Sequence, residues 1–140
     1  MIKGLRVKAI IKEPYREAIS LINAEDAYFD EFVDLMPFAT DFIKLQRASL
    51  IPTGSSAYMP TGWLIHDEIA TDGFGHVFDI ETGYWAFQCC LKNSEKEVDV
   101  FLQDVLSQLI ESAIHIEVKS DEEDESELYH FINGHIVRVS

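Results

Sequence analysis

Long hydrophobic runs are absent from this sequence. No stretch of apolar residues reaches the length of about 18 that a membrane-spanning helix needs. Apolar and basic residues alternate over positions 1–8, so the apolar segment of a secretory signal peptide is missing. We therefore expect a soluble, cytoplasmic protein.

Cysteine is scarce, and its two positions exclude a disulfide framework. Cys89 and Cys90 are neighbours in the chain, and side chains of successive strand residues point to opposite faces. The pair therefore favours a reducing compartment. One cysteine is predicted to face the core and the other a helix or solvent. Redox chemistry would need a further, spaced thiol, which the chain lacks.

Basic residues are few: 11 Lys and Arg stand against 25 Asp and Glu, for a net charge of −14. The imbalance is greatest over residues 95–127, with twelve acidic and two basic side chains. Such a field repels nucleic acid and anionic membranes. It attracts a basic protein in a manner that salt weakens. We therefore expect a basic protein partner, no nucleic acid and no membrane.

Recognisable catalytic motifs are also missing. The chain has no GxSxG, no phosphate-binding loop of the GxxxxGK[ST] type, no CxxC and no HExxH. Residues 72–75, Asp-Gly-Phe-Gly, contain two glycines, but a strand pattern and no helix follows them. Phosphate binding by a helix N-terminus is therefore not predicted, and a tight turn is. We expect no cofactor and no catalytic residue.

Two of the five histidines are predicted to lie on one face of a hairpin. Asn133-Gly134 suits a two-residue turn because both positions need positive φ. The resulting register places Ile132 opposite His135, so that His130 and His135 share a face. With Asp79 or Glu117 nearby they could assist a metal-dependent reaction, although the spacings typical of metal sites are missing. No metal site is therefore assigned.

Hydrophobic periodicity predicts alternating helices and strands around one core. Residues 4–11 alternate as a half-buried strand whose inward face is Leu5, Val7, Ala9 and Ile11. Further strands are expected at 63–70, at 76–80 and 84–91 as a hairpin, at 114–118, and at 128–132 and 135–139 as a second hairpin. Helices are expected at 14–23, 26–36 and 94–113, with further turns at 38–46 and a loop at 51–62. The pattern predicts a single α/β domain over residues 1–140, of the α+β type, with a mainly antiparallel sheet and helices packed on one face.

The helix at 94–113 has the strongest pattern. A continuous apolar stripe runs from Val98 to Ala113 at helical spacing. Ser94 and Glu97 have the spacing of a capping box at its start. Upstream, Ala18, Leu21 and Ile22 are the predicted inward residues of the first helix, and in the strand after the long helix Ile114, Ile116 and Val118 are expected to face the core.

An acidic run joins the last predicted strands. It is either a solvated loop or an electrostatic arm for a cationic surface, held on the folded body because strands flank it. The candidate partner-binding residues are Asp121, Glu122, Glu123, Asp124, Glu125 and Glu127, with Asp67, Glu68 and Asp72 as possible additions.

Three motifs together resemble the SUKH superfamily, small α/β domains that include many bacterial immunity proteins. Leu35-Met36-Pro37 followed by Phe42-Ile43 is similar to that family's leucine-proline element. Residues 72–80 followed by Thr82-Gly83 resemble its glycine-rich turn, strand and aspartate, and Phe101-Leu102 resembles its late aromatic-leucine helix. The resemblance spans residues 28–113. It implies a bacterial binding protein that neutralises a toxin by occluding it.

Three functions follow as hypotheses. The first is an immunity protein whose carboxylates occupy the basic surface of a cognate toxin, for example a nuclease. The second is a small metal-assisted enzyme that uses His130, His135 and a carboxylate. The third is a regulatory or scaffold homodimer that pairs through an exposed edge strand.

Overall fold

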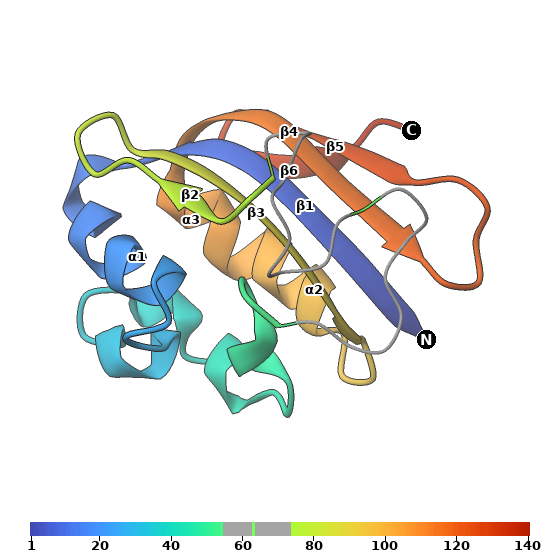
Figure 1. Ribbon diagram of the computed structural model, residues 1–140, viewed down its shortest axis with the longest axis horizontal. Helices are drawn as coiled ribbons and strands as arrows, with labels where there is room; N and C mark the ends of the chain where they lie inside the picture. Colours follow the sequence, from blue (N-terminus) through green and yellow to red (C-terminus); the bar gives the residue numbers. More distant parts are fainter. Residues whose placement is uncertain (55–62, 64–73) are drawn as a thin grey trace.

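The sheet is antiparallel and has helices on one face, as the sequence predicts (Figure 1). The computed structural model describes residues 1–54, 63 and 74–140, so the predicted loop at 51–62 and strand at 63–70 lie mostly outside the described residues. Within them the strand order is β2-β3-β1-β4-β5-β6. The strands are β1 (Ile2–Ile11), β2 (Val77–Phe78), β3 (Tyr84–Lys92), β4 (Ile110–Ser120), β5 (Glu127–Ile132) and β6 (His135–Arg138).

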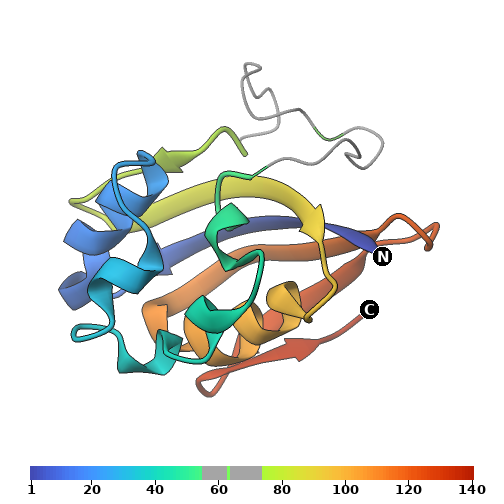
Figure 2. The same cartoon turned by 90° about the horizontal axis from the view of Figure 1, so that it is seen from below.

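The first strand of the chain lies in the middle of the sheet. β1 pairs with β3 on one side and with β4 on the other, both antiparallel. Its alternation is the predicted one, because Leu5, Val7, Ala9 and Ile11 are all fully buried. These side chains face the helical layer, which Figure 2 shows on one side of the sheet.

The predicted hairpin before the long helix is confirmed. β2 pairs with β3 through Val77 opposite Ala86 and Phe78 opposite Trp85. Gly83 ends the turn with φ +81°, a left-handed conformation that glycine adopts without strain.

The first predicted helix is confirmed, with a different buried face. A short 3-10 turn, η1 (Glu13–Tyr15), leads into α1 (Arg16–Asn23). Its buried residues are Ala18, Ile19 and Ile22, whereas Leu21 is exposed. The prediction for Leu21 was wrong because α1 turns Ile19, two residues earlier, into the core, which leaves Leu21 on the opposite side of the helix.

The second predicted helix, over 26–36, was wrong. The structure has a single 3-10 turn there, η2 (Phe29–Phe32), after Glu25 with φ +64°. Phe29 and Met36 of this stretch are buried in the core, whereas Tyr28 and Leu35 are exposed, so its apolar residues share no common helical face. The turns that follow are η3 (Pro37–Ala39), η4 (Phe42–Lys44) and η5 (Ala48–Leu50).

The long helix is shorter than its apolar stripe. It consists of α2 (Glu97–Val100), a π-helical segment η6 (Phe101–Leu106) and α3 (Ser107–Leu109). It ends at Leu109 because Ile110 pairs with Ile11 and begins β4. Within the described residues, no helix has both the length and the apolar character needed to cross a membrane.

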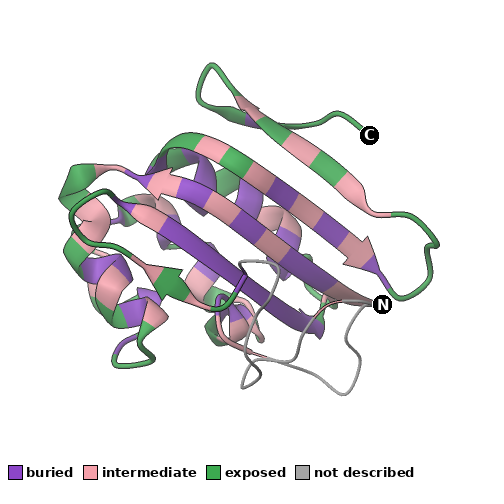
Figure 3. Cartoon of the chain, turned by 45° about the horizontal axis from the view of Figure 1, so that its top comes forward, coloured by how far each residue is buried: buried purple, intermediate pink, exposed green. Residues whose placement is uncertain are grey.

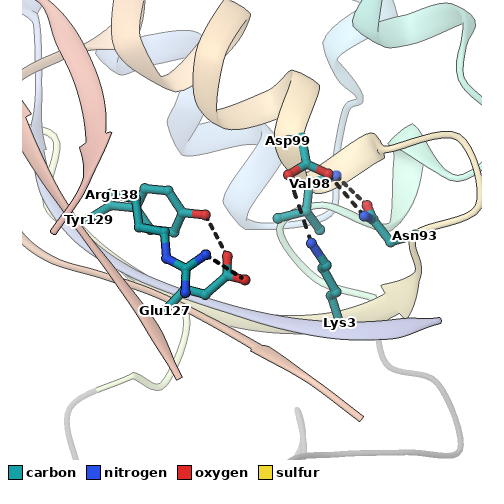
Figure 4. Close-up of polar contacts among 7 residues, drawn as sticks. All are labelled: Lys3, Asn93, Val98, Asp99, Glu127, Tyr129 and Arg138. Carbon is teal, nitrogen blue, oxygen red and sulfur yellow. Dashed lines mark hydrogen bonds and ion pairs between the residues drawn. The ribbon is translucent and has the colours of Figure 1, made fainter. Parts of the chain in front are cut away.

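Asn93, rather than Ser94, holds the start of this helix. Its Oδ1 accepts a hydrogen bond of 2.9 Å from the Val98 amide, as Figure 4 shows. The Glu97 carboxylate is fully buried and accepts hydrogen bonds from the amides of Glu95 and Arg47. The predicted capping box is therefore replaced by a contact that fastens η5 to the helix.

The core lies between the sheet and the helical layer. Figure 3 shows buried residues concentrated in the central strands. Cys89 belongs to this core, and Cys90 is also fully buried, on the opposite face of β3. Neither thiol faces solvent, so the prediction that allowed solvent for one of them was wrong in that respect. Burial raises the pKa of the Cys89 thiol, and the neighbouring Cys90 raises it further.

Candidate functional site

The acidic loop is fastened to the central strand of the sheet. The Ile2 amide donates a hydrogen bond of 3.1 Å to Asp121 Oδ1, and the Asp121 amide donates one of 2.9 Å to the Ile2 carbonyl. Lys119 Nζ donates to the carbonyls of Ser120 and Glu123. In Figure 1 the loop joins β4 to β5 beside the N-terminus. The structure therefore confirms a loop held against the body.

Four carboxylates of this loop point their charge into solvent. Glu122, Glu123, Asp124 and Glu125 are exposed. None of the four forms an ion pair with any residue that the structure describes. Asp121 is also exposed, but its carboxylate is used in the contact with β1. The structure thus presents a compact group of negative charge on a tethered loop.

Glu127 is engaged elsewhere. Its Oε1 accepts a hydrogen bond of 2.6 Å from the Tyr129 hydroxyl, and its Oε2 lies 3.6 Å from Arg138 Nη1 (Figure 4). Burial raises the pKa of Tyr129, and the hydrogen bond to Glu127 raises it further. The Glu127 charge is therefore partly balanced within the β5–β6 hairpin.

A second carboxylate links a hydroxyl to an imidazole. Glu117 Oε2 accepts a hydrogen bond of 2.5 Å from Ser126 Oγ, and Glu117 Oε1 lies 2.8 Å from His115 Nε2. A serine nucleophile would need the imidazole beside its hydroxyl, whereas here the carboxylate stands between them. The three residues do not form a hydrolytic triad. Nothing in the sequence indicated this contact, because Ser126 lies in the acidic loop, nine residues after Glu117.

The pKa of Glu117 is lowered. Burial alone would raise it, but the hydrogen bonds from Ser126 and His115 and the charges of His115 and Arg6 outweigh burial. The carboxylate therefore stays ionised and anchors the end of the acidic loop to β4.

Two aromatic rings lie over two of the basic residues of β1, Arg6 and Lys8. The guanidinium of Arg6 is 4.3 Å from the Trp63 ring centroid and 4.6 Å from that of Phe74. Lys8 Nζ is 4.3 Å from the Phe74 centroid, and this ring also contacts His115. The positive charges of Arg6 and Lys8 are thus in contact with aromatic faces.

The predicted register of the last hairpin is confirmed. Ile132 pairs with His135 and His130 with Val137, so the two histidines share an exposed face. Asp79 lies at the β2 edge, across the sheet, and Glu117 is bound to His115. In the described ranges, no group of three potential metal ligands occurs.

The outer face of this hairpin is mostly aliphatic. We call it the hairpin face; it consists of Leu128, His130, Ile132, His135, Val137 and Val139. Figure 3 shows β5 and β6 with many more exposed and intermediate residues than the central strands. The sequence pattern indicated the hairpin but gave no sign that this face stays uncovered.

A β-bulge opens the sheet beside the hairpin face. Between Lys8 paired with His115 and Ala9 paired with Ala113, Ile114 is the extra residue. Its side chain is 62% exposed, so the prediction that it faces the core was wrong. A bulge bends its strand and ends regular pairing. The β4–β5 ladder accordingly stops at Ile116 opposite Tyr129.

The separation of β4 and β5 leaves a hollow of about 280 Å³. It is lined by Ala113, Ile114, Tyr129, His130, Phe131 and Ile132. A second concavity, of about 210 Å³, lies among the 3-10 turns and is lined mainly by apolar residues between Tyr28 and Ile51. Neither has the converging polar groups that typify a catalytic pocket.

The remaining predicted site residues, Asp67, Glu68 and Asp72, lie outside the described residues. No protein family, curated protein or solved structure matches the chain. The resemblance to the SUKH superfamily therefore stays a prediction from the sequence motifs.

Proposed function

We propose that the protein is a bacterial immunity protein of the SUKH type that neutralises a basic toxin by covering its surface with the acidic loop. The observation that carries the proposal is the group of four exposed carboxylates at 122–125 on a loop tied to β1 through Asp121. A tethered loop loses less conformational entropy on binding than a free tail does.

The charge of the chain supports a basic partner. At −14 it steers a cationic protein into contact, and salt weakens that steering. A nuclease suits the proposal best, because its active site is built to hold phosphate and so presents a positive cleft to carboxylates. The proposed role needs no catalytic residue of this chain.

The protein encoded by the neighbouring gene is the probe for the test. Its binding to the purified chain is measured at roughly 50 mM and 300 mM salt, where screening differs strongly. We expect binding that is faster and tighter at the lower salt. Absence of binding at both salt concentrations would overturn the proposal.

A charge-matched pair of variants locates the site. The loop variant carries Glu122→Lys, Glu123→Lys, Asp124→Lys and Glu125→Lys. The control variant carries Glu13→Lys, Glu17→Lys, Asp26→Lys and Asp34→Lys, which are exposed positions distant from the loop in the sequence. Both change the net charge equally. We expect the loop variant to lose affinity by on the order of a hundredfold and the control variant far less. Equal losses would show that only net charge matters.

A further inference from the structure

The hairpin face has no Asp, Glu, Lys or Arg side chain, although the protein is strongly acidic. Its six side chains are four aliphatic residues and two histidines, while the chain as a whole carries 25 acidic residues. Ile114 on the neighbouring strand β4 is also exposed. Summed roughly, the exposed aliphatic side chains offer about 400 Å², within the range of patches that mark interaction sites.

The edge of β6 is a poorer contact than this face. The Ile136 carbonyl points away from β5 and accepts a hydrogen bond of 3.0 Å from Gln103 Nε2 of η6. Ile136 itself is buried. Because a helix side chain takes part of the edge, pairing with a further strand along β6 is hindered.

We propose that two copies of the chain pack hairpin face against hairpin face, with a twofold axis along β5. Adjacent strands are roughly 4.8 Å apart, so the hollow on one side of β5 and Val137 on the other side lie at similar distances from that axis. A half-turn about the axis places Val137 of one copy over the hollow of the other. Each copy thus supplies both the projecting side chain and the space that receives it, as an isologous interface requires.

Size and charge agree with a second copy. The hollow, about 280 Å³, exceeds the volume of one valine side chain, and Val137 is 43% exposed. The hairpin face has no carboxylate of its own, and the neighbouring Glu117 carboxylate, opposite Leu128, is held by Ser126 and His115, so two acidic chains meet there with few opposed charges. Since the aliphatic area is below the roughly 800 Å² per partner of a standard interface, we expect a weak, concentration-dependent dimer.

The position of the axis predicts how salt affects the stability of the dimer. It keeps the acidic loops of both copies at the same end of the assembly, where they repel each other. Screening this repulsion strengthens the dimer. Binding of a basic toxin is expected to respond in the opposite direction, so the dimer and the proposed function succeed or fail separately.

Sedimentation velocity over roughly micromolar to several hundred micromolar protein tests the dimer. We expect the mass to rise from 16.0 kDa towards twice that value, and to rise further when salt is added. Val137→Asp is expected to raise the dimer dissociation constant at least tenfold. The matched control is Val77→Asp, because Val77 is 47% exposed at the other edge of the sheet and should leave the dimer unchanged.

A cross-link tests the position of the axis. The two native thiols are buried, so a His130→Cys variant offers a single reactive thiol close to the axis, which a short bismaleimide should join to its copy. An Ile80→Cys variant should stay uncross-linked. If Val137→Asp does not fold, as judged by circular dichroism, Val137→Lys replaces it. A monomer at all concentrations, a dimer that the folded Val137 variant leaves intact, or equal cross-linking at both sites would each overturn the proposal.

Discussion

Trp85 Nε1 donates a hydrogen bond of 3.0 Å to Asn23 Oδ1, joining a fully buried indole on β3 to the last residue of α1. Asn23 Nδ2 in turn donates one of 3.1 Å to the His76 carbonyl before β2. One amide therefore satisfies a buried donor and a backbone acceptor from two other elements. This contact fixes where α1 lies on the sheet.

We expect Asn23→Ala to lower the free energy of unfolding by about 1–3 kcal/mol, because it leaves the Trp85 N–H without its partner in the core. Asn23→Asp keeps the oxygen and loses only the donor to His76, so its loss should be smaller. Urea denaturation monitored by tryptophan fluorescence measures both. Equal stability of Asn23→Ala and wild type would contradict this role.

Two glycines with nearly the same φ form a matched pair. Gly83 has φ +81° and Gly134 has φ +79°. A Cβ at Gly83 would lie 2.5 Å from the Ile11 carbonyl oxygen and 2.6 Å from Arg16 Nε, whereas one at Gly134 meets nothing within 4 Å. Gly134→Ala should therefore cost about 1–2 kcal/mol for the left-handed backbone alone. Gly83→Ala should cost clearly more. Thermal unfolding of the two variants, compared with wild type, decides between these expectations and an equal loss.

The lowered pKa of Glu117 predicts acid sensitivity. Its folded-state pKa lies below the ordinary 4.5, so ionised Glu117 stabilises the fold above that pH. The stabilisation is lost as pH falls through the folded-state pKa. Glu117→Gln should be less stable than wild type near neutral pH, and this difference should shrink in acid. The exposed Glu122→Gln is the control. Urea midpoints at about pH 7 and about pH 3 give the comparison; a constant difference would argue against the assignment.

The raised pKa of Tyr129 predicts alkaline sensitivity. The folded state keeps the phenolic proton above the ordinary pKa of 10.0, whereas the unfolded chain releases it. Stability therefore falls as pH rises above that value. Tyr129→Phe, which has no proton to release, should lose less stability between about pH 9 and pH 11. Absorbance of the phenolate near 295 nm checks that one tyrosine of wild type resists ionisation.

Local sequence patterns predicted an element correctly where its tertiary contacts favour the same conformation. The alternation of β1 determines which side chains are buried, and the Asn133-Gly134 turn determines the register of its hairpin; both predictions are confirmed. The long helix was extended too far because Ile110 continues the apolar spacing of a helix. Ile110 begins β4 instead, because it pairs with Ile11, almost a hundred residues earlier in the chain. The periodicity of neighbouring residues does not report such a distant partner.

The candidate site was predicted in part. The run of acidic residues is evident from the sequence. The two predicted strands that flank it also imply a loop held at both ends. The hydrogen bond from Ile2 to Asp121 and the link from Ser126 through Glu117 to His115 were not predictable, because each joins residues whose proximity depends on the sheet order. The bulge at Ile114 breaks alternation by one residue, and sequence alternation alone counts that residue as inward.

The central place of β1 also bears on how the protein is made. During synthesis β1 leaves the ribosome before its two partners, β3 and β4, which begin only at residues 84 and 110. Until then Leu5, Val7, Ala9 and Ile11 have no sheet to join, and the contacts that finally bury them are distant in sequence. Folding should therefore be slow for so small a chain. During synthesis the apolar face of β1 is therefore a segment that a chaperone would protect.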